Sequence, residues 1–235
     1  MQSFFIWNNR DCRSMGITLA GPAPIVRPEE RVKHVEIPGV AGDLTEIEGE
    51  NIYNSYIQTV SMTVTDHFNV RDVFEWLRGS GYVTFSGEPD RKQAARVIGA
   101  VTLNRISRNL DKWQGEVQFY CQPLKELLKE TPVTLTASGT VKNTGDVAAK
   151  PLLKVTPSST SCSVKIGDDT ITVTGTTSGT AIWIDSETME VWNSDRSATI
   201  TKNSSGNFPV LQPGANTVTL TSVSSIEITK RERFL

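Results

Sequence analysis

The chain has 235 residues with a formal net charge of −2, and 37% of its residues are hydrophobic against 21% charged. This composition is typical of a globular protein, and the near-balance of charge argues against the concentrated basic surface with which proteins hold nucleic acid or an anionic membrane. No apolar run approaches the roughly 20 residues of a membrane-spanning helix, and the N-terminus lacks the pattern of a secretory signal, so we expect no membrane insertion.

The first half of the chain predicts short strands separated by turn residues. The clearest strand covers residues 56–64, where Val60, Met62 and Val64 alternate with polar residues, as in a half-buried strand. Further strands are expected at residues 4–7, 16–19, 82–85, 96–103 and 113–121, and a helical turn is expected at residues 124–130.

One short helix is expected between residues 69 and 79. Asn69 is a suitable N-cap, and Gly79 supplies the left-handed residue that ends a helix. The apolar residues that recur at helical spacing between them are Val70, Val73, Phe74 and Leu77.

Residues 39–51, GVAGDLTEIEGEN, differ from their surroundings because they are rich in glycine and acidic residues and contain few apolar residues. Glycine and acidic residues favour turns and solvent. We therefore expect a mobile loop or a hairpin tip here, and not a core strand.

Threonine marks a change of composition near residue 130. Residues 1–130 contain seven threonines, whereas residues 131–230 contain twenty. Threonine is β-branched and suits a half-buried pleated surface, so we expect a second, largely antiparallel β domain. The predicted domains are residues 1–130 and 131–235.

The second domain is predicted to be a β-sandwich of nine short strands. The expected strands are residues 133–136, 152–156, 162–166, 171–174, 181–185, 189–192, 198–201, 217–223 and 225–229.

The three cysteines are too few and too scattered for a disulfide framework or a zinc site. Cys121 alternates with Val117 and Phe119, and Cys162 alternates with Val164 and Ile166, so we interpret both as small hydrophobic residues on strand faces. Synthesis in a reducing cytoplasm is the corresponding expectation.

No residue pattern predicts catalysis. The two histidines, His34 and His67, lie outside any nucleophile motif, and His34 with Glu36 is too small a set for a metal site. A glycosidase would need two acids facing one another across a cleft, and the turn at Gly167-Asp168-Asp169 explains its own acids without catalysis. We therefore predict no enzyme activity, no catalytic residue, no cofactor and no metal.

The tryptophans of the second half form a candidate contact face. If a tight turn covers residues 185–188, Trp183 lies opposite Glu190 and Ala181 opposite Trp192, which makes the two indoles diagonal neighbours. Asp185 and Glu190 then lie beside them, while Ile182, Ile184, Met189 and Val191 form the buried face. Three interpretations stay open: a platform for sugar stacking, a patch covered by another chain, or a surface under another part of the same chain.

The order of several segments resembles the distal tail proteins, Dit, of long-tailed siphophages and their prophages. In the first domain these segments are FFIWNNRDCRSMGITL (4–19), EWLRGSGYVTF (75–85) and VQFYCQP (117–123). In the second they are NTGDVAAKPLLKV (143–155), AIWIDSETMEVWN (181–193), GNFPVLQPGANTV (206–218) and IEITKRERFL (226–235).

The resemblance implies a mainly β chain in which a β-sandwich-like N-terminal tail domain with one short helix precedes a galectin-like C-terminal β-sandwich. It implies a structural protein of the virion tail tip, assembled in the host cytoplasm. The implied partners are five further copies in a hexameric ring, the tail tube protein and the tail-tip hub protein, with DNA passing through. Ring closure needs head-to-tail surfaces, and residues 39–51 are a candidate extension toward a neighbour.

An alternative function is a carbohydrate-binding module or adhesin that recognises host-surface glycans. Its site residues would be Trp183, Trp192, Asp185 and Glu190 of the second domain. A galectin-like fold does not establish sugar binding, because one fold carries many different sites. Sugar-binding faces usually join aromatic platforms to several polar groups, and only the two acids are evident here, so we favour the structural role.

Overall fold

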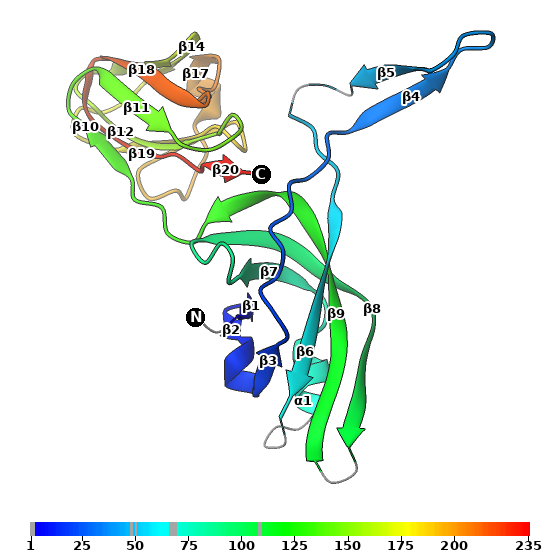
Figure 1. Cartoon of the computed structure of the whole chain (residues 1–235). Coiled ribbons are helices and arrows are strands. Elements are labelled where there is room, and N and C mark those ends of the chain that lie inside the picture. The colour runs from blue at the N-terminus through cyan, green and yellow to red at the C-terminus, as the bar shows by residue number, and fades with distance from the viewer. Residues whose placement is uncertain (1–2, 48, 50, 66–69, 108–109) are drawn as a thin grey trace. The chain divides into compact units, whose positions relative to one another are not determined.

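The structure is a computed structural model, and it describes residues 3–47, 49, 51–65, 70–107 and 110–235 (Figure 1). The expected mainly β fold class is confirmed. Two compact units are present: one runs from the N-terminus to Leu128 and includes Leu235, and the other covers Lys129–Phe234. Each unit is described by itself below.

The N-terminal unit is built on one antiparallel sheet with the strand order β2-β1-β7-β8-β9-β6-β3. Its two long strands are β8 and β9, which form a hairpin and pair along most of their length. Strand β6 has the bounds expected from its alternation. The strands are β1 (Phe5–Trp7), β2 (Arg10–Asp11), β3 (Ile17–Leu19), β6 (Tyr56–Val64), β7 (Ser80–Phe85), β8 (Arg91–Ser107) and β9 (Leu110–Leu127), and a 3₁₀ helix, η1, covers Cys12–Met15.

Strand β9 continues through residues 124–127, the first part of the segment where a helical turn was expected. Pairing between Arg91 and Leu127 extends the β8–β9 ladder to the end of this strand. The Lys125 ammonium is buried and contacts the Glu88 carboxylate at 2.6 Å, which compensates the charge of the lysine. A local sequence pattern cannot identify this partner, because Glu88 is distant along the chain. The expectation of a helical turn was wrong because cross-strand partners decide this segment.

The core of the N-terminal unit is rich in aromatic rings. Phe119 contacts Phe5, Trp7 and Phe85 at ring-centroid distances of 5.5, 5.3 and 5.9 Å. Helix α1 (Val70–Trp76) adds Trp76, which stacks on Phe5 at 5.5 Å.

The helix matches its predicted position in most respects. Val73 and Leu77 are buried, and Gly79 has the left-handed φ of 78° expected of it. Phe74, expected on the buried face, is 39% exposed. Asn69 lies outside the described residues.

Strands β4 (Val32–Glu36) and β5 (Asp43–Ile47) form a separate two-stranded sheet. Residues 43–47, expected in a mobile loop or a hairpin tip, are instead a strand in register with β4, from Glu36 opposite Asp43 to Val32 opposite Ile47. The prediction that this segment is not a core strand agrees with its exposure, since every residue of β5 is exposed. We call this hairpin, residues 32–47, the arm.

The C-terminal unit is a sandwich of two antiparallel five-stranded sheets. One sheet has the order β10-β19-β12-β15-β16 and the other β11-β18-β13-β14-β17. The first contains β10 (Val133–Leu135), β12 (Leu152–Pro157), β15 (Ile182–Asp185), β16 (Glu190–Trp192) and β19 (Val223–Thr229). The second contains β11 (Gly139–Asn143), β13 (Ser161–Ile166), β14 (Asp169–Thr174), β17 (Ser204–Gly206) and β18 (Gly214–Thr221).

The sequence missed some short elements of this unit. β11, β17 and the final β20 (Arg233–Phe234) lack the apolar alternation that marks a strand. The strand expected at residues 198–201 is absent as such: Thr199 makes an isolated bridge to Trp192, and a 3₁₀ helix, η2, covers Thr201–Asn203. Alternating buried Val, Ile and Leu side chains from both sheets form the core of this unit.

Candidate functional site

The two tryptophans of the candidate face lie directly opposite one another in the β15–β16 hairpin. Trp183 pairs with Trp192, and Asp185 pairs with Glu190. The expected register, with Trp183 opposite Glu190 and Ala181 opposite Trp192, was wrong. Directly opposed side chains are closer than diagonal ones, so the indoles form a tighter pair than the sequence predicts.

The register differs because the turn begins later than the sequence pattern indicated. The Asp185 carboxylate accepts hydrogen bonds from the backbone N–H groups of Glu187 and Thr188 at 3.0 and 3.4 Å. Met189 then takes a left-handed φ of 56° and is 59% exposed, so it belongs to the turn and not to the buried face. The other residues predicted for the buried face, Ile182, Ile184 and Val191, are buried.

The Trp183 indole is already engaged by its own chain. Its Nε1–H donates to the Ser194 carbonyl at 3.2 Å. The Lys154 ammonium and the Arg196 guanidinium lie 5.6 and 5.3 Å from the ring centroid, within the range of cation–π attraction. A ligand that stacks on this indole competes with these contacts.

A row of paired residues crosses the outer face of this sheet. Cross-strand pairing places Glu227 beside Lys154, Lys154 beside Trp183, and Trp183 beside Trp192. The Lys154 ammonium contacts the Glu227 carboxylate at 3.0 Å. The row thus joins a surface ion pair to two half-buried indoles.

Asp185 serves the fold. Its side chain is buried, and its two oxygens accept hydrogen bonds from the Arg231 guanidinium at 2.6 and 2.9 Å. Burial by itself raises the pKa of this carboxyl, but the hydrogen bonds and the charge of Arg231 outweigh burial and hold the pKa below its usual value. Of the four predicted site residues, the acid that remains half-exposed beside the indoles is Glu190.

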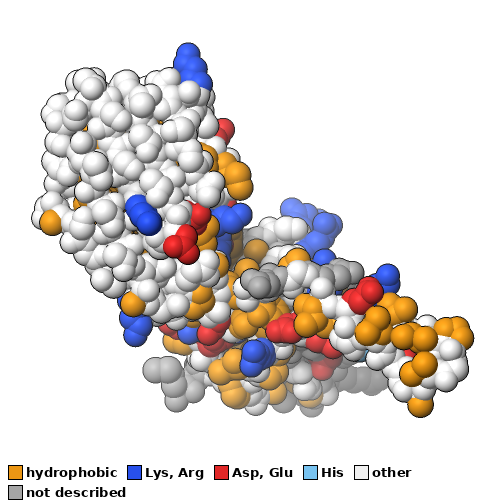
Figure 2. All heavy atoms as spheres, turned by 90° about the horizontal axis from the view of Figure 1, so that it is seen from above, with side chains coloured by type: hydrophobic (Ala, Val, Ile, Leu, Met, Phe, Trp, Pro, Cys, Tyr) orange, Lys and Arg blue, Asp and Glu red, His pale blue; other side chains and the backbone are white. Residues whose placement is uncertain are grey.

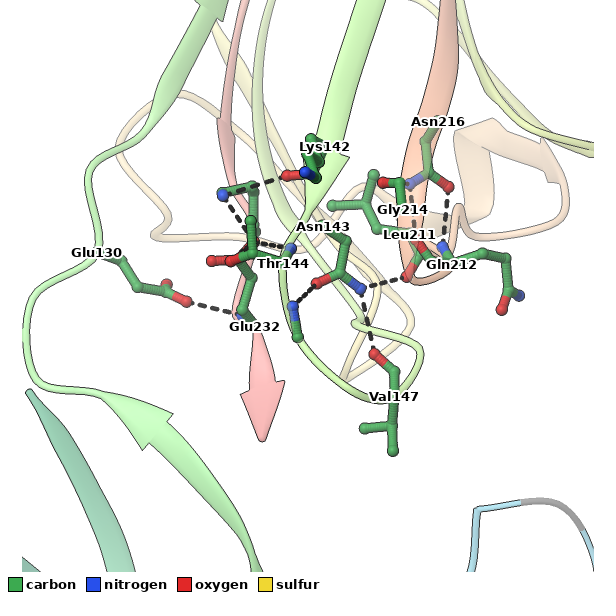
Figure 3. Close-up of polar contacts among 12 residues, drawn as sticks. Glu130, Lys142, Asn143, Thr144, Val147, Leu211, Gln212, Gly214, Asn216 and Glu232 are labelled. Carbon is green, nitrogen blue, oxygen red and sulfur yellow. Dashed lines mark hydrogen bonds and ion pairs between the residues drawn. The ribbon is translucent and has the colours of Figure 1, made fainter. Parts of the chain in front are cut away.

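Ion pairs that were not predicted from the sequence hold the segment 230–233, KRER, in place. The carboxylate of Glu232, buried in the C-terminal unit, accepts hydrogen bonds from Thr144 N–H at 2.5 Å and from the Lys230 ammonium at 2.7 Å (Figure 3). Arg231 and Arg233 each contact Glu187 at 3.2 Å. The run of four charged residues at 230–233 was the available signal.

The turn phrase NTGD at residues 143–146 is also structural. Asn143 is buried, and its amide donates to the carbonyls of Val147 and Leu211 at 3.1 and 3.0 Å, while its carbonyl oxygen accepts from Gly145 N–H at 2.9 Å (Figure 3). Its three bonds satisfy a buried polar group and close the loop after β11.

The backbone N–H of Glu232 donates to the Glu130 carboxylate at 2.9 Å (Figure 3). Burial raises the pKa of Glu130, and the charge of nearby Glu232 adds to the rise. The pKa of Glu232 itself is lowered, because its bonds from Lys230 and Thr144 outweigh the effect of burial.

The other candidate chemistry of the sequence does not assemble. His34 lies on the exposed arm, 3.4 Å from the Thr45 hydroxyl, and His67 lies outside the described residues. All three cysteines are buried, and burial raises the pKa of the Cys121 thiol to about 12. Within the described residues, no group of three or more His, Cys, Asp or Glu side chains is placed to hold a metal ion. No helix in the described part of the chain is long and apolar enough to cross a membrane.

Comparison with known proteins gives two findings. Residues 144–234 match the family model of the siphovirus-type tail component, C-terminal domain. The whole fold is similar to the crystal structure of SPP1 Dit (gp 19.1), with a TM-score of 0.79, 19% sequence identity and 100% coverage of both chains. No curated protein sequence matches the chain.

The C-terminal part of the chain is thus similar to the siphovirus-type tail component, C-terminal domain, and the whole chain has the fold of a phage tail protein. The likeness to the distal tail protein Dit of SPP1 agrees with the resemblance seen in the sequence. The SPP1 protein is described as a paradigm of the hub adsorption apparatus in phages that infect Gram-positive bacteria.

Proposed function

We propose that the chain forms a hexameric ring at the tip of the virion tail, through the domain of residues 1–130. The ring joins the tail tube protein to the tail-tip hub protein and lets DNA pass. Assembly takes place in the host cytoplasm, and the domain of residues 131–235 completes the subunit. The likeness to a protein of the hub adsorption apparatus supports this role.

The observation that carries the proposal is the apolar surface of the arm. Ile37, Val40, Leu44 and Ile47 are 44%, 61%, 50% and 66% exposed. Figure 2 shows hydrophobic side chains gathered where this hairpin extends from the rest of its unit. Exposed apolar patches on soluble proteins mark contact sites, and here the site is carried by a projecting hairpin.

The arm also has unpaired strand edges. Among the described residues, β4 and β5 pair only with each other, and an isolated two-stranded hairpin has marginal stability in water. A second copy of the chain is a suitable partner, because a ring is closed by contacts between two different surfaces of each subunit. The arm supplies one surface of such a head-to-tail contact.

Charge on the arm tests this role. In the variant Leu44→Glu/Ile47→Glu, one charge lies on each face of the hairpin, and burying either charge against a neighbour is unfavourable. We expect folded monomers in place of rings by size-exclusion chromatography with light scattering and negative-stain imaging. The matched control, Thr140→Glu/Thr217→Glu, adds the same charges on an exposed strand pair of the C-terminal unit and should leave rings intact. Rings of the arm variant would reject the assignment, and monomeric wild type at high concentration would reject the ring.

A second proposal concerns the Trp183–Trp192 face, favoured by the direct opposition of two half-buried indoles. We propose that it takes a host-surface glycan as an accessory role, with Trp192 and Glu190 as the contacts. Trp183 and Asp185 position this pair, since their own partners are Ser194 and Arg231. A glycan array with the full chain tests it. Trp192→Ala should abolish binding, and binding that survives this change, or none by the wild type, would reject it.

A further inference from the structure

The loop that follows β16, residues 193–198, is closed by its own hydrogen bonds. The backbone N–H groups of Asn193 and Arg196 donate to the carbonyls of Ala198 and Asn193, both at 3.1 Å. The side chain of Asn193 accepts from Ala198 N–H at 3.1 Å and donates to the Ser197 hydroxyl at 3.0 Å. None of these bonds uses the side chain of Arg196.

The loop holds Arg196 over the Trp183 indole. The guanidinium carbon lies 5.3 Å from the ring centroid, within the range of cation–π attraction. Arg196 has a left-handed φ of 60°, a conformation that is unfavourable for a residue with a long side chain and that calls for a functional explanation. The bond from the indole Nε1–H to the Ser194 carbonyl ties the ring to the same loop. Trp183 is therefore a platform for the guanidinium.

Two nearby charged groups are engaged within the chain. The Lys154 ammonium, on the same indole, contacts the Glu227 carboxylate at 3.0 Å. The Asp195 carboxylate accepts from the N–H and the hydroxyl of Ser197 at 3.1 and 2.7 Å. Neither the lysine nor the aspartate is thus a ready partner for the charge of a ligand.

One cation and one acid beside Trp192 remain without an opposite charge. Within the described residues, neither Arg196 nor Glu190 makes an ion pair. Glu190 lies two residues before Trp192 on the same face of β16, and Arg196 lies on Trp183, which pairs directly with Trp192. Directly opposed side chains are close neighbours, so both charges border the Trp192 indole.

These three groups have complementary chemistry. An indole offers an apolar ring on which a sugar ring can stack. A guanidinium presents N–H donors in a planar fork that matches a carboxylate or a phosphate, and it retains those donors while it stacks on an aromatic ring. A carboxylate accepts hydrogen bonds from hydroxyl groups. A neutral sugar would use the indole and the carboxylate of Glu190 but would leave the guanidinium of Arg196 unused.

We infer that Arg196 is a ligand-binding residue and that the Trp183–Trp192 face takes an anionic glycan, one that carries a phosphate or carboxylate group. This inference rests on the glycan proposal above. The sugar ring stacks on Trp192, the anionic group accepts hydrogen bonds from Arg196, and Glu190 accepts one from a sugar hydroxyl. Trp183 positions the guanidinium, which explains why its indole is engaged by its own chain.

Oligosaccharides in matched forms test the role of Arg196. A glycan array presents each oligosaccharide in a neutral, a phosphorylated and a uronic acid form, and it is probed with the full chain. Wild type should bind one or both anionic forms about tenfold or more better than the neutral form, because hydrogen bonds between two charged groups are the strong ones. The form that is preferred identifies phosphate or carboxylate as the group bound. Arg196→Gln should bind all three forms equally.

Two further variants control this experiment. Lys165→Gln removes an exposed cation from β13, on the other sheet of the same unit, and should keep the preference of wild type. Arg196→Gly removes the side chain and suits the left-handed backbone, so it keeps the loop if the glutamine variant does not fold. This glycine variant should also lose the preference.

The possible failures are distinguishable. Wild type that binds neutral and anionic forms equally would overturn the role of Arg196 and leave the glycan proposal standing. An anionic preference that survives in Arg196→Gln, or that Lys165→Gln loses to the same extent, would also overturn it. Wild type that binds no glycan would overturn both proposals.

Discussion

The two units enclose cores of different chemistry. In the N-terminal unit, Phe5, Trp7 and Phe119 are fully buried, the Phe119 ring contacts the other two, and Trp76 and Phe85 pack against this core. The core of the C-terminal unit is aliphatic, with Val, Ile and Leu alternating from two facing sheets. Tryptophan accordingly lies inside the first unit at Trp7 and on the outer face of the second at Trp183.

The difference shows where each unit concentrates its stability. A few large rings carry much of the N-terminal core, so the loss of one ring leaves a large cavity. The aliphatic core spreads its burial over many smaller side chains, and the C-terminal unit adds buried polar bonds at Asn143, Asp185 and Glu232. Substitutions in the two units should therefore differ in how much stability they remove and in which region of the chain they destabilise.

The largest effect is expected for Phe119→Ala, which removes the ring that contacts three other aromatic side chains. We expect a loss of about 3–5 kcal/mol in the stability of the N-terminal unit. Hydrogen–deuterium exchange with mass spectrometry should show faster exchange in peptides of β6 and β9 and no change in peptides of β12 and β13. The control Phe74→Ala, at a 39% exposed ring, should cost about 1 kcal/mol or less. Equal losses for both variants would contradict an aromatic core centred on Phe119.

Asp185→Asn tests the buried ion pair of the C-terminal unit. Removing one charge leaves Arg231 without its bidentate partner, at a cost of about 2–3 kcal/mol. Lys154→Gln is the control, because it breaks an ion pair of two well-exposed side chains and should cost about 1 kcal/mol or less. Chemical unfolding, monitored by hydrogen–deuterium exchange in peptides of the C-terminal unit, measures the loss of stability in both variants.

Acid should remove the difference between Asp185→Asn and wild type. The folded pKa of Asp185 lies below its ordinary value of 3.8, so the stabilisation is complete above that pH and is lost as pH falls through the lowered pKa. The stability gap should be constant near neutrality and shrink below pH 3.8. A gap that stays constant into acid would show that the hydrogen-bond geometry matters and the charge does not.

A smaller effect is expected for Gly145→Ala. A Cβ at this position would lie 2.5 Å from the Arg233 carbonyl oxygen and 3.0 Å from its nitrogen, so the backbone of the closing segment has to move. We expect a loss of about 1–3 kcal/mol, seen as a lower unfolding midpoint. Gly21→Ala meets nothing within 4 Å and should be neutral or slightly stabilising. A neutral result at Gly145 would show that the contact with Arg233 relaxes without cost.

The sequence predicted individual strands well where alternation was strong. The bounds of β6 follow from Val60, Met62 and Val64, whose burial on one face needs only local periodicity. Short strands such as β11 and β17 carry too little pattern, and the arm was missed as a strand pair because none of its β5 residues is buried. The helical turn expected at residues 124–130 was wrong because the partner strand β8 decides that segment.

The candidate site shows the same division. The sequence identified the Trp183–Trp192 hairpin and put both indoles on one face, but the register depended on where the turn begins, which the hydrogen bonds of Asp185 determine. The role of Asp185 depended on Arg231, which is distant in sequence and reaches it only in the folded unit. Local spacing carries no information on such a partner.

The sequence by itself determined a mainly β chain, the approximate position of most strands and a balance of charge that argues against an electrostatic grip on DNA. It did so because alternation, turn residues and net charge are properties of neighbours along the chain or of the whole composition. Only the tertiary structure decided which strands pair in the N-terminal sheet, which apolar residues of the arm are exposed and which acid is bound by Arg231. These depend on strand pairing and burial between distant segments, and sequence spacing leaves both open.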